Sequence, residues 1–380
     1  MVGKKNVIST ILQSFIAMGV VSVIWVVFGF SLAFGDDCGG FIGNPASFFM
    51  FQHVGAKIDT YLAPTIPLAL YALFQMKFAI ITPSLITGSF AERVRFSGYL
   101  IFMILFCIFV YCPLAHWTWH PDGFLRQMGV VDFAGGIVVH ASSGVAALAG
   151  AIFLGRRSGK RHAPANIPFV ILGAAMLWLG WFGFNAGSSL AADGIAIKAF
   201  LNTNTASATA MMVWIFFDCL RGRKPSALGA AVGAVVGLVA ITPSAGYVTV
   251  GESIFIALTT TMVCNVAVYW KNKTSVDDAL DVFPTHGVGG IFGTVLTGVF
   301  VNGLFAGNVS VFLIHLLAVV LVCGYTFIVS YALYWLTNKM IPLRVSARSE
   351  AIGLDLSQHD ESYGYADEGE RELAEYHAEN

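Results

Sequence analysis

Ten long apolar stretches constrain the fold of this chain more than any other feature of its sequence. They lie at about residues 7–34, 62–90, 97–119, 132–154, 166–189, 200–219, 226–242, 250–270, 284–302 and 311–338. Roughly 20 helical residues cross a hydrocarbon core about 30 Å thick. Because lipid offers no partner for backbone polar groups, such stretches form helices. The sequence therefore predicts an all-α polytopic membrane protein, a bundle of about ten transmembrane helices.

Composition supports this class and excludes others. Hydrophobic residues make up 57% of the chain and charged residues 11%, whereas a soluble domain carries about 25% charged residues. A nucleic-acid-binding protein, a disordered chain and a secreted disulfide scaffold are excluded on this ground. The first stretch, after Lys4 and Lys5, is about twice as long as the apolar region of a signal peptide. We therefore predict a helix that is retained.

The basic residues predict the orientation. Of 21 Lys and Arg residues, 16 fall in one set of alternate connections and only Lys57, Arg126 and Lys198 fall in the opposite set. Basic loops stay in the cytoplasm, so both ends of the chain are predicted to be cytoplasmic. Ten of the 22 acidic residues lie after residue 345. We therefore predict a transmembrane domain over residues 1–345 and an acidic cytoplasmic tail over residues 346–380.

Two histidines lie within the apolar stretches at matching positions. His140 follows Asp132 by eight residues, and His286 follows Asp278 by the same interval. The shared spacing indicates two related halves, a common plan in transporters. Eight helical residues span about 12 Å, so each aspartate can cap its helix while each histidine lies well inside the membrane.

The chemistry of these histidines leaves two interpretations open. Two imidazole rings side by side can share a proton and line a path for a small hydrogen-bonding solute. Alternatively, each ring is bonded separately to a backbone carbonyl. Metal binding is disfavoured, because a metal site needs three or four ligands and no further ligand accompanies the pair. His315 has no aspartate partner and is expected to be structural.

Aromatic residues provide a second clue. Phe74 and Phe78 share a helix face, Trp181 and Phe184 lie in the block WFGFNAGSS, and Trp119 ends the third stretch. Most aromatic residues in membrane helices contact lipid or pack against neighbours, but an indole face also attracts weakly hydrated cations. A cation site, a phenyl constriction and a histidine-lined lumen would together pass a small cation or its neutral form.

Glycines also recur at helical spacing. Gly229, Gly233 and Gly237 repeat every four residues, which allows helix backbones to approach closely. We interpret them as packing residues without a role in substrate binding.

Several blocks resemble a known family. They are FQMKFAIITPSLITGSFAERVRFS, DFAGGIVVHASSGVAAL, WFGFNAGSS, DDALDVFPTHGVGGIFG and the tail GLDLSQHDESYGY. In this order they resemble the ammonium transporters (Amt/Mep, with the Rh proteins as relatives), and the conventional bacterial Amt pattern is closer than the Rh pattern. The resemblance implies a fold with inverted-repeat halves and homotrimers with one pore per subunit.

The resemblance also implies residue roles. Its matched positions suggest an outer ammonium-binding site, a gate below it, a pair of pore histidines, and residues that support the path. The outer site would consist of Phe78, Trp119 and Ser188, and the gate of Phe78 and Phe184. The pore histidines would be His140 and His286, and the supporting residues Asp132, Phe74 and Trp181.

The implied activity is transport, not enzymatic catalysis, and it requires no cofactor or metal. Ammonium, with methylammonium as its analogue, would bind outside, lose a proton near Asp132 and the gate, and pass the histidines as ammonia. The proton would travel separately or return. The protein would lie in the cell membrane, where a PII-type regulatory protein would bind its cytoplasmic face. An ammonium sensor with little flux is the alternative, and a histidine-dependent metal permease is a third hypothesis.

Two features depart from the family pattern. The family has eleven helices, and this chain begins at the loop after the first of them, so we expect one member of the inverted repeat to be absent. Lys77 is charged and adjacent to the implied gate residue Phe78. It either extends toward the membrane surface or pairs with a neighbouring subunit.

Overall fold

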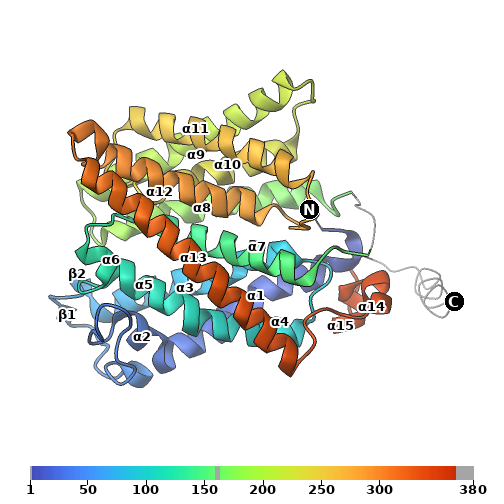
Figure 1. The fold of residues 1–380 in the computed structure, drawn as a ribbon, viewed down its shortest axis with the longest axis horizontal. Helices are drawn as coiled ribbons and strands as arrows, with labels where there is room; N and C mark the ends of the chain where they lie inside the picture. The colour runs from blue at the N-terminus through green and yellow to red at the C-terminus, as the bar shows by residue number, and fades with distance from the viewer. Residues whose placement is uncertain (1, 159–162, 365–380) are drawn as a thin grey trace.

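The computed structural model describes residues 2–158 and 163–364. They form a helical bundle of ten long rods, each of which is one α-helix or a helix continued through a π-helical turn. Figure 1 shows how these rods pack. The first five rods are α1 (Val7–Ile24) continued by η2 (Trp25–Gly29) and α2 (Phe30–Phe34), α3 (Leu68–Phe90), α4 (Phe96–Phe106) continued by η4 (Cys107–Tyr111) and α5 (Cys112–Trp119), η5 (Gly136–Ala141) continued by α7 (Ser142–Leu154), and α8 (Ile167–Ala186). The other five are α9 (Gly194–Leu220), α10 (Ala227–Ile241), α11 (Val250–Lys271), η7 (Phe283–Gly287) continued by α12 (Val288–Phe300), and α13 (Val309–Met340).

Shorter elements lie at the two ends of the bundle. One end carries η3 (Phe49–Phe51), the hairpin strands β1 (Ile58–Asp59) and β2 (Ala63–Pro67), α6 (Phe124–Gln127), η6 (Gly187–Ser189) and η8 (Leu304–Ala306). The other end carries η1 (Lys4–Asn6), α14 (Ala347–Ile352) and α15 (Leu354–His359). In Figure 1, α8 to α12 form one group, α1, α3, α4 and α7 form another, and α13 crosses both diagonally.

The ten predicted apolar stretches each correspond to one rod. Within the described residues, eight helices are both long and apolar enough to cross a membrane. The other two are α10, which has only 15 residues, and α9, which has 27 residues and buries the polar side chains of Asn202, Thr203 and Ser207. The chain is therefore an integral membrane protein, as predicted.

Some predicted boundaries were wrong for local reasons. The second stretch was expected to begin at residue 62, but α3 begins at Leu68, because residues 63–67 pair with β1 and include Pro64 and Pro67. The sixth was expected at residue 200, whereas α9 begins at Gly194. The Asp193 side chain accepts a hydrogen bond from the Ala196 amide at 2.8 Å and caps this earlier start.

Both ends of the described chain lie on the same side of the bundle. The Asp355 carboxylate in α15 accepts hydrogen bonds from the amides of Ile8 and Ser9 at 3.0 and 2.7 Å, and Leu354 donates to Asn6 Oδ1 at 2.8 Å. The tail thus caps α1, at the end of the bundle opposite the β hairpin (Figure 1). Lys160, Arg161 and residues 365–380 of the predicted acidic tail lie outside the described residues.

The predicted packing role of the glycine repeat is confirmed. A Cβ atom at Gly233 would lie 2.7 Å from Trp214 Cβ and 2.9 Å from the Ala210 carbonyl oxygen, and one at Gly237 would overlap the Ala206 carbonyl. All three neighbours belong to α9. The glycines therefore allow α9 and α10 to approach closely.

The two halves match at the starts of α7 and α12. Each helix is preceded by a π-helical turn that contains the histidine, η5 for His140 and η7 for His286. Each turn is capped by an aspartate: Asp132 accepts from four backbone amides, and Asp278 accepts from Val282 and Phe283 at 3.1 and 2.7 Å. Because the two helices begin at opposite ends of the bundle, the repeat is inverted.

Candidate functional site

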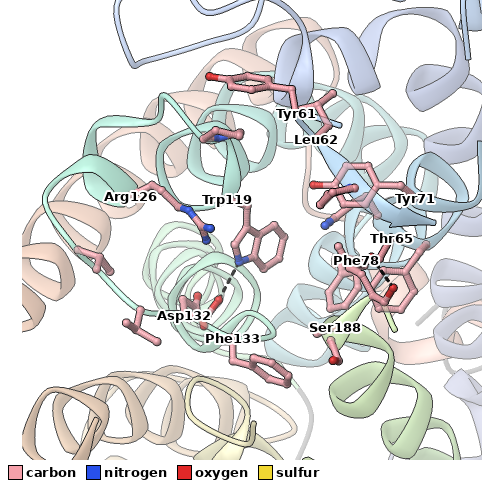
Figure 2. Close-up of a pocket in the computed structure, with 18 of the residues that line it drawn as sticks. Tyr61, Leu62, Thr65, Tyr71, Phe78, Trp119, Arg126, Asp132, Phe133 and Ser188 are labelled. Carbon is pink, nitrogen blue, oxygen red and sulfur yellow. Dashed lines mark hydrogen bonds between the residues drawn. The ribbon is translucent and has the colours of Figure 1, made fainter. Parts of the chain in front are cut away.

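A cavity of about 590 Å³ opens at the end of the bundle that carries the β hairpin. We call it the vestibule. Its wall combines the start of α3, the end of α5, the loop before η5, and η6 (Figure 2). Phe78, Trp119 and Ser188, which the family resemblance assigned to one binding site, all line it, together with Asp132 and Phe74.

Trp119 is held in place by a single polar contact. Its indole Nε1 donates a hydrogen bond to the Asp132 carbonyl oxygen at 2.9 Å, drawn as a dashed line in Figure 2. The Phe78 ring meets the indole edge to face, with 5.5 Å between centroids. Because the only indole donor is already engaged, Trp119 offers the vestibule its aromatic surface.

The Asp132 carboxylate does not face the vestibule as a free charge. Oδ1 accepts hydrogen bonds from Gly135 and Gly136 at 3.0 and 2.5 Å, and Oδ2 accepts from Ile137 and Val138 at 2.9 and 3.2 Å. Four charge-assisted bonds at a helix start hold the negative charge in place. The geometry supports the expectation that Asp132 acts by positioning its neighbours and by its field, not by direct contact.

Ser188 presents acceptor capacity on the opposite wall. Its hydroxyl donates to the Phe184 carbonyl oxygen at 2.9 Å, which leaves the oxygen lone pairs as acceptors. In Figure 2, Ser188 and Phe78 lie across the cavity from Asp132.

Two phenyl rings close the bottom of the vestibule. The centroids of Phe78 and Phe184 lie 4.5 Å apart, and Phe78 is 2% exposed. Phe74 packs edge to face against Phe78 at 5.0 Å. The three rings form a hydrophobic constriction at the bottom of the vestibule.

The histidines lie directly beyond this constriction. His140 Nδ1 lies 3.3 Å from His286 Nδ1, with 5.4 Å between ring centroids. Phe184 stacks near His140 at 5.8 Å, and Trp181 stacks on it at 5.2 Å with an interplanar angle of 13°. The rings therefore meet each other, which matches the first of the two interpretations of the sequence.

His315 and Lys77 lie apart from this path. The Val131 amide donates to His315 Nε2 at 3.1 Å, and Nδ1 contacts the Val311 carbonyl oxygen at 2.8 Å, so Nδ1 carries the proton. Both ring nitrogens are bonded to backbone, as expected for a structural histidine. Lys77 lies on the exposed face of α3, whereas Phe78 is buried.

Some residues on the vestibule wall were not singled out from the sequence. Tyr71 and Gln75 line it from α3, and the exposed Arg126 points into it from α6 (Figure 2). The sequence could have identified Gln75, because it is a polar residue in an apolar helix one turn before Phe78. The sequence could not have identified Arg126, because a basic residue in an outer loop gives no indication of the direction of its side chain.

A second polar cluster lies at the opposite end of the bundle. Arg157 forms ion pairs with Glu92 at 2.7 Å and with Asp277 at 2.8 Å. Partial burial disfavours the charged carboxylate, but the hydrogen bonds and charge of Arg157 outweigh it and lower the pKa of Asp277 to about 2. The buried Arg93 donates to the Asp277 carbonyl oxygen at 2.6 Å. These contacts tie three connections together beneath His286.

Comparison with known proteins agrees with the fold. The family model for the Ammonium Transporter Family matches residues 1–364. An ammonium transporter of Bacillus subtilis is 43% identical over 372 residues, which cover 95% of this chain and 91% of that protein.

Solved structures give the same result. The crystal structure of Saccharomyces cerevisiae Mep2 superposes with a TM-score of 0.84 at 33% identity, covering 89% of this chain and 80% of that one. A structure described as a sensor Amt protein superposes with a TM-score of 0.86 at 30% identity, covering 94% and 91%. With an inverted helical repeat, an aromatic vestibule and paired histidines, this chain belongs to the ammonium transporter family.

Proposed function

We propose that this protein takes up ammonium through the vestibule and conducts ammonia past His140 and His286. The ammonium gives up its proton to water near Asp132 and the phenyl constriction, and this proton either returns to the vestibule side or crosses by a separate path. The observation that carries the proposal is the unbroken file of rings from Trp119 through Phe78 and Phe184 to the two histidines. Each contact in that file is at most 5.8 Å between centroids.

The walls explain why ammonium would be captured before it is deprotonated. Ammonium and potassium have the same charge and nearly the same size, so selection has to use hydrogen bonds and aromatic contact. The indole face of Trp119 attracts a cation, and the Ser188 oxygen accepts one of its N–H groups. The field of the fixed Asp132 carboxylate adds to this attraction.

The constriction explains why the proton would be lost there. Transfer of an intact cation into an apolar lumen is costly, whereas a neutral amine loses far less solvation. Beyond the gate, the Nδ1 atoms of His140 and His286 are paired with each other. The ring nitrogens outside this pair, such as the unpartnered His140 Nε2, can accept from ammonia or donate to it, depending on the tautomer. Potassium cannot shed a proton, so the same step would exclude it.

The test is charge movement in proteoliposomes on addition of ammonium, with a potassium jump for comparison. We expect an ammonium-selective signal that His140→Ala combined with His286→Ala alters in size or selectivity. His53→Asn, at an exposed outer histidine, is the matched control. An unchanged signal in the double variant would contradict the mechanism.

If no current is seen, ammonia flux and ammonium binding would be measured on the same vesicles. Flux without current would indicate neutral conduction, in which the proton returns. Binding without flux would favour the second candidate, an ammonium sensor, which the similarity to a structure described as a sensor Amt protein supports. If neither binding nor flux is detected, both candidates are contradicted.

We also propose that the protein forms a homotrimer in the cell membrane with both termini in the cytoplasm, and that a PII-type protein docks on the basic inner end. The placement of α14 and α15 against α1 supports this surface. Removal of residues 346–380 should change PII binding or transport. Removal of residues 365–380 alone would distinguish the contribution of the distal acidic residues from that of α14 and α15. If PII binding and transport are unchanged in both variants, the proposal is contradicted.

A further inference from the structure

Gln75 lies on the vestibule wall with an unused acceptor. It precedes Phe78 by three residues on α3, so the two side chains share a face of the helix. The residue is 8% exposed, and its Oε1 atom is buried without a hydrogen-bond partner.

A buried acceptor without a partner requires an explanation, because nearly all such groups in folded proteins are bonded to protein, water or an ion. Other buried side-chain atoms in the described residues also have no partner, and they include His140 Nε2. Among the residues that line the vestibule, Gln75 is the one with such an atom. This acceptor is therefore placed where the substrate enters.

Several other polar groups of the wall are already engaged by the protein, whereas the Arg126 guanidinium points into the vestibule and offers only donors. Trp119 donates to Asp132, Ser188 donates to Phe184, and the Thr65 hydroxyl donates to the Leu190 carbonyl oxygen at 2.8 Å. The Asp132 carboxylate accepts hydrogen bonds from four backbone amides. The side-chain acceptors left for a ligand are hydroxyl lone pairs and the amide oxygen of Gln75.

Ammonium fits this set, because it carries four N–H donors and no acceptor. We propose that Gln75 Oε1 accepts one of these donors as the cation reaches the gate, and that it favours ammonium over methylammonium. The inference rests on the proposed function of the vestibule and adds a residue that sets its specificity. Rotation of the terminal amide group, a broad and soft torsion, brings the oxygen toward an arriving cation.

The preference follows from counting donors. Methylammonium has three N–H donors and a methyl group, so it needs one acceptor fewer and one apolar contact more. Replacement of the Gln75 amide by an apolar group should therefore weaken ammonium binding and leave methylammonium nearly unaffected. A purely structural role for Gln75 would affect both substrates equally.

The experiment uses Gln75→Met, which keeps a similar length and volume but has no strong acceptor, and Gln75→Leu. Gln52→Met, at an exposed residue of the same end of the bundle, is the control. Half-saturating concentrations of ammonium and of methylammonium would be measured by uptake or current, and by ligand-induced thermal stabilisation, which does not require flux.

We expect the half-saturating ammonium concentration to rise about tenfold in both Gln75 variants, which corresponds to about 1.4 kcal/mol. The value for methylammonium should stay within about twofold, and the control should match the unmodified protein. Equal losses for the two substrates, or no loss for either, would overturn the inference. If the unmodified protein neither binds nor transports ammonium, the proposed function itself fails, and this inference fails with it.

Discussion

His140 Nδ1 and His286 Nδ1 lie 3.3 Å apart, although 146 residues separate them in the chain. Their helices begin at opposite ends of the bundle and cross beside the two rings. A Cβ atom at Gly144, one turn after His140, would overlap the backbone of Gly287, the residue after His286. Contact between two glycine backbones is therefore what allows the histidines to meet.

This contact predicts that Gly144→Ala destabilises the protein and separates the histidines. The obstacle is backbone, which cannot move aside as a side chain can, so we expect a loss of about 1–3 kcal/mol of unfolding free energy. Thermal unfolding in detergent would measure it. Gly173→Ala in α8, where a Cβ atom would meet nothing within 4 Å, should have no such effect. A neutral Gly144→Ala variant would show that the crossing is looser than described.

The two capping aspartates should differ in importance. Asp132→Asn leaves one acceptor oxygen for four backbone amides, whereas Asp278→Asn leaves one for two. Because hydrogen bonds to charged groups contribute about 1.5–3 kcal/mol each, Asp132→Asn should lower the unfolding temperature more. Parallel melting curves of the two variants test the order, and a larger effect of Asp278→Asn would contradict it.

The inner ion pairs predict a dependence of stability on pH. The pKa of Asp277 is about 2 in the folded protein and about 3.9 for an unfolded aspartate. A lowered pKa stabilises the fold above the unfolded value, and this contribution is lost as the pH falls from about 4 to about 2. Unfolding of the protein and of Asp277→Asn should therefore differ at pH 7 and converge in that window. A constant difference down to pH 2 would rule out this ion pair as the cause.

Lys77 should not affect selectivity. It faces outward from α3 while Phe78 faces the gate, so Lys77→Leu is expected to leave the half-saturating ammonium concentration unchanged. A charge facing lipid is unfavourable, so the variant should be at least as stable in a bilayer if Lys77 meets lipid, and less stable if it pairs with a neighbouring subunit. Altered ammonium-over-potassium discrimination in Lys77→Leu would assign the lysine a role at the gate after all.

The tail contact can be tested by Asp355→Ala. This change removes the acceptor for the amides of Ile8 and Ser9, and loss of a helix cap costs about 0.5–2 kcal/mol. We expect faster proteolysis after Arg344 or Arg348, because α14 and α15 would detach from α1 more often. Unchanged cleavage would show that Lys5 and Asn6 hold the tail without the carboxylate.

The sequence by itself determined the class of fold, the helices, the pairing of the two ends on one side, and the capping aspartates. These features follow from local rules, because a helix in lipid satisfies its own backbone and basic loops remain on one side. The structural role expected for His315 also follows from a local rule, because a lone buried histidine bonds its two ring nitrogens to nearby backbone groups.

Tertiary structure alone decided which side chains meet. The spacing from Asp132 to His140 fixes a position along one helix but not the distance to His286, which depends on the contact between Gly144 and Gly287. The fixed orientation of Trp119 and the unpartnered oxygen of Gln75 likewise depend on packing between segments far apart in sequence. Periodicity along a chain reports which face a residue occupies, whereas distances between helices arise only when the helices pack together.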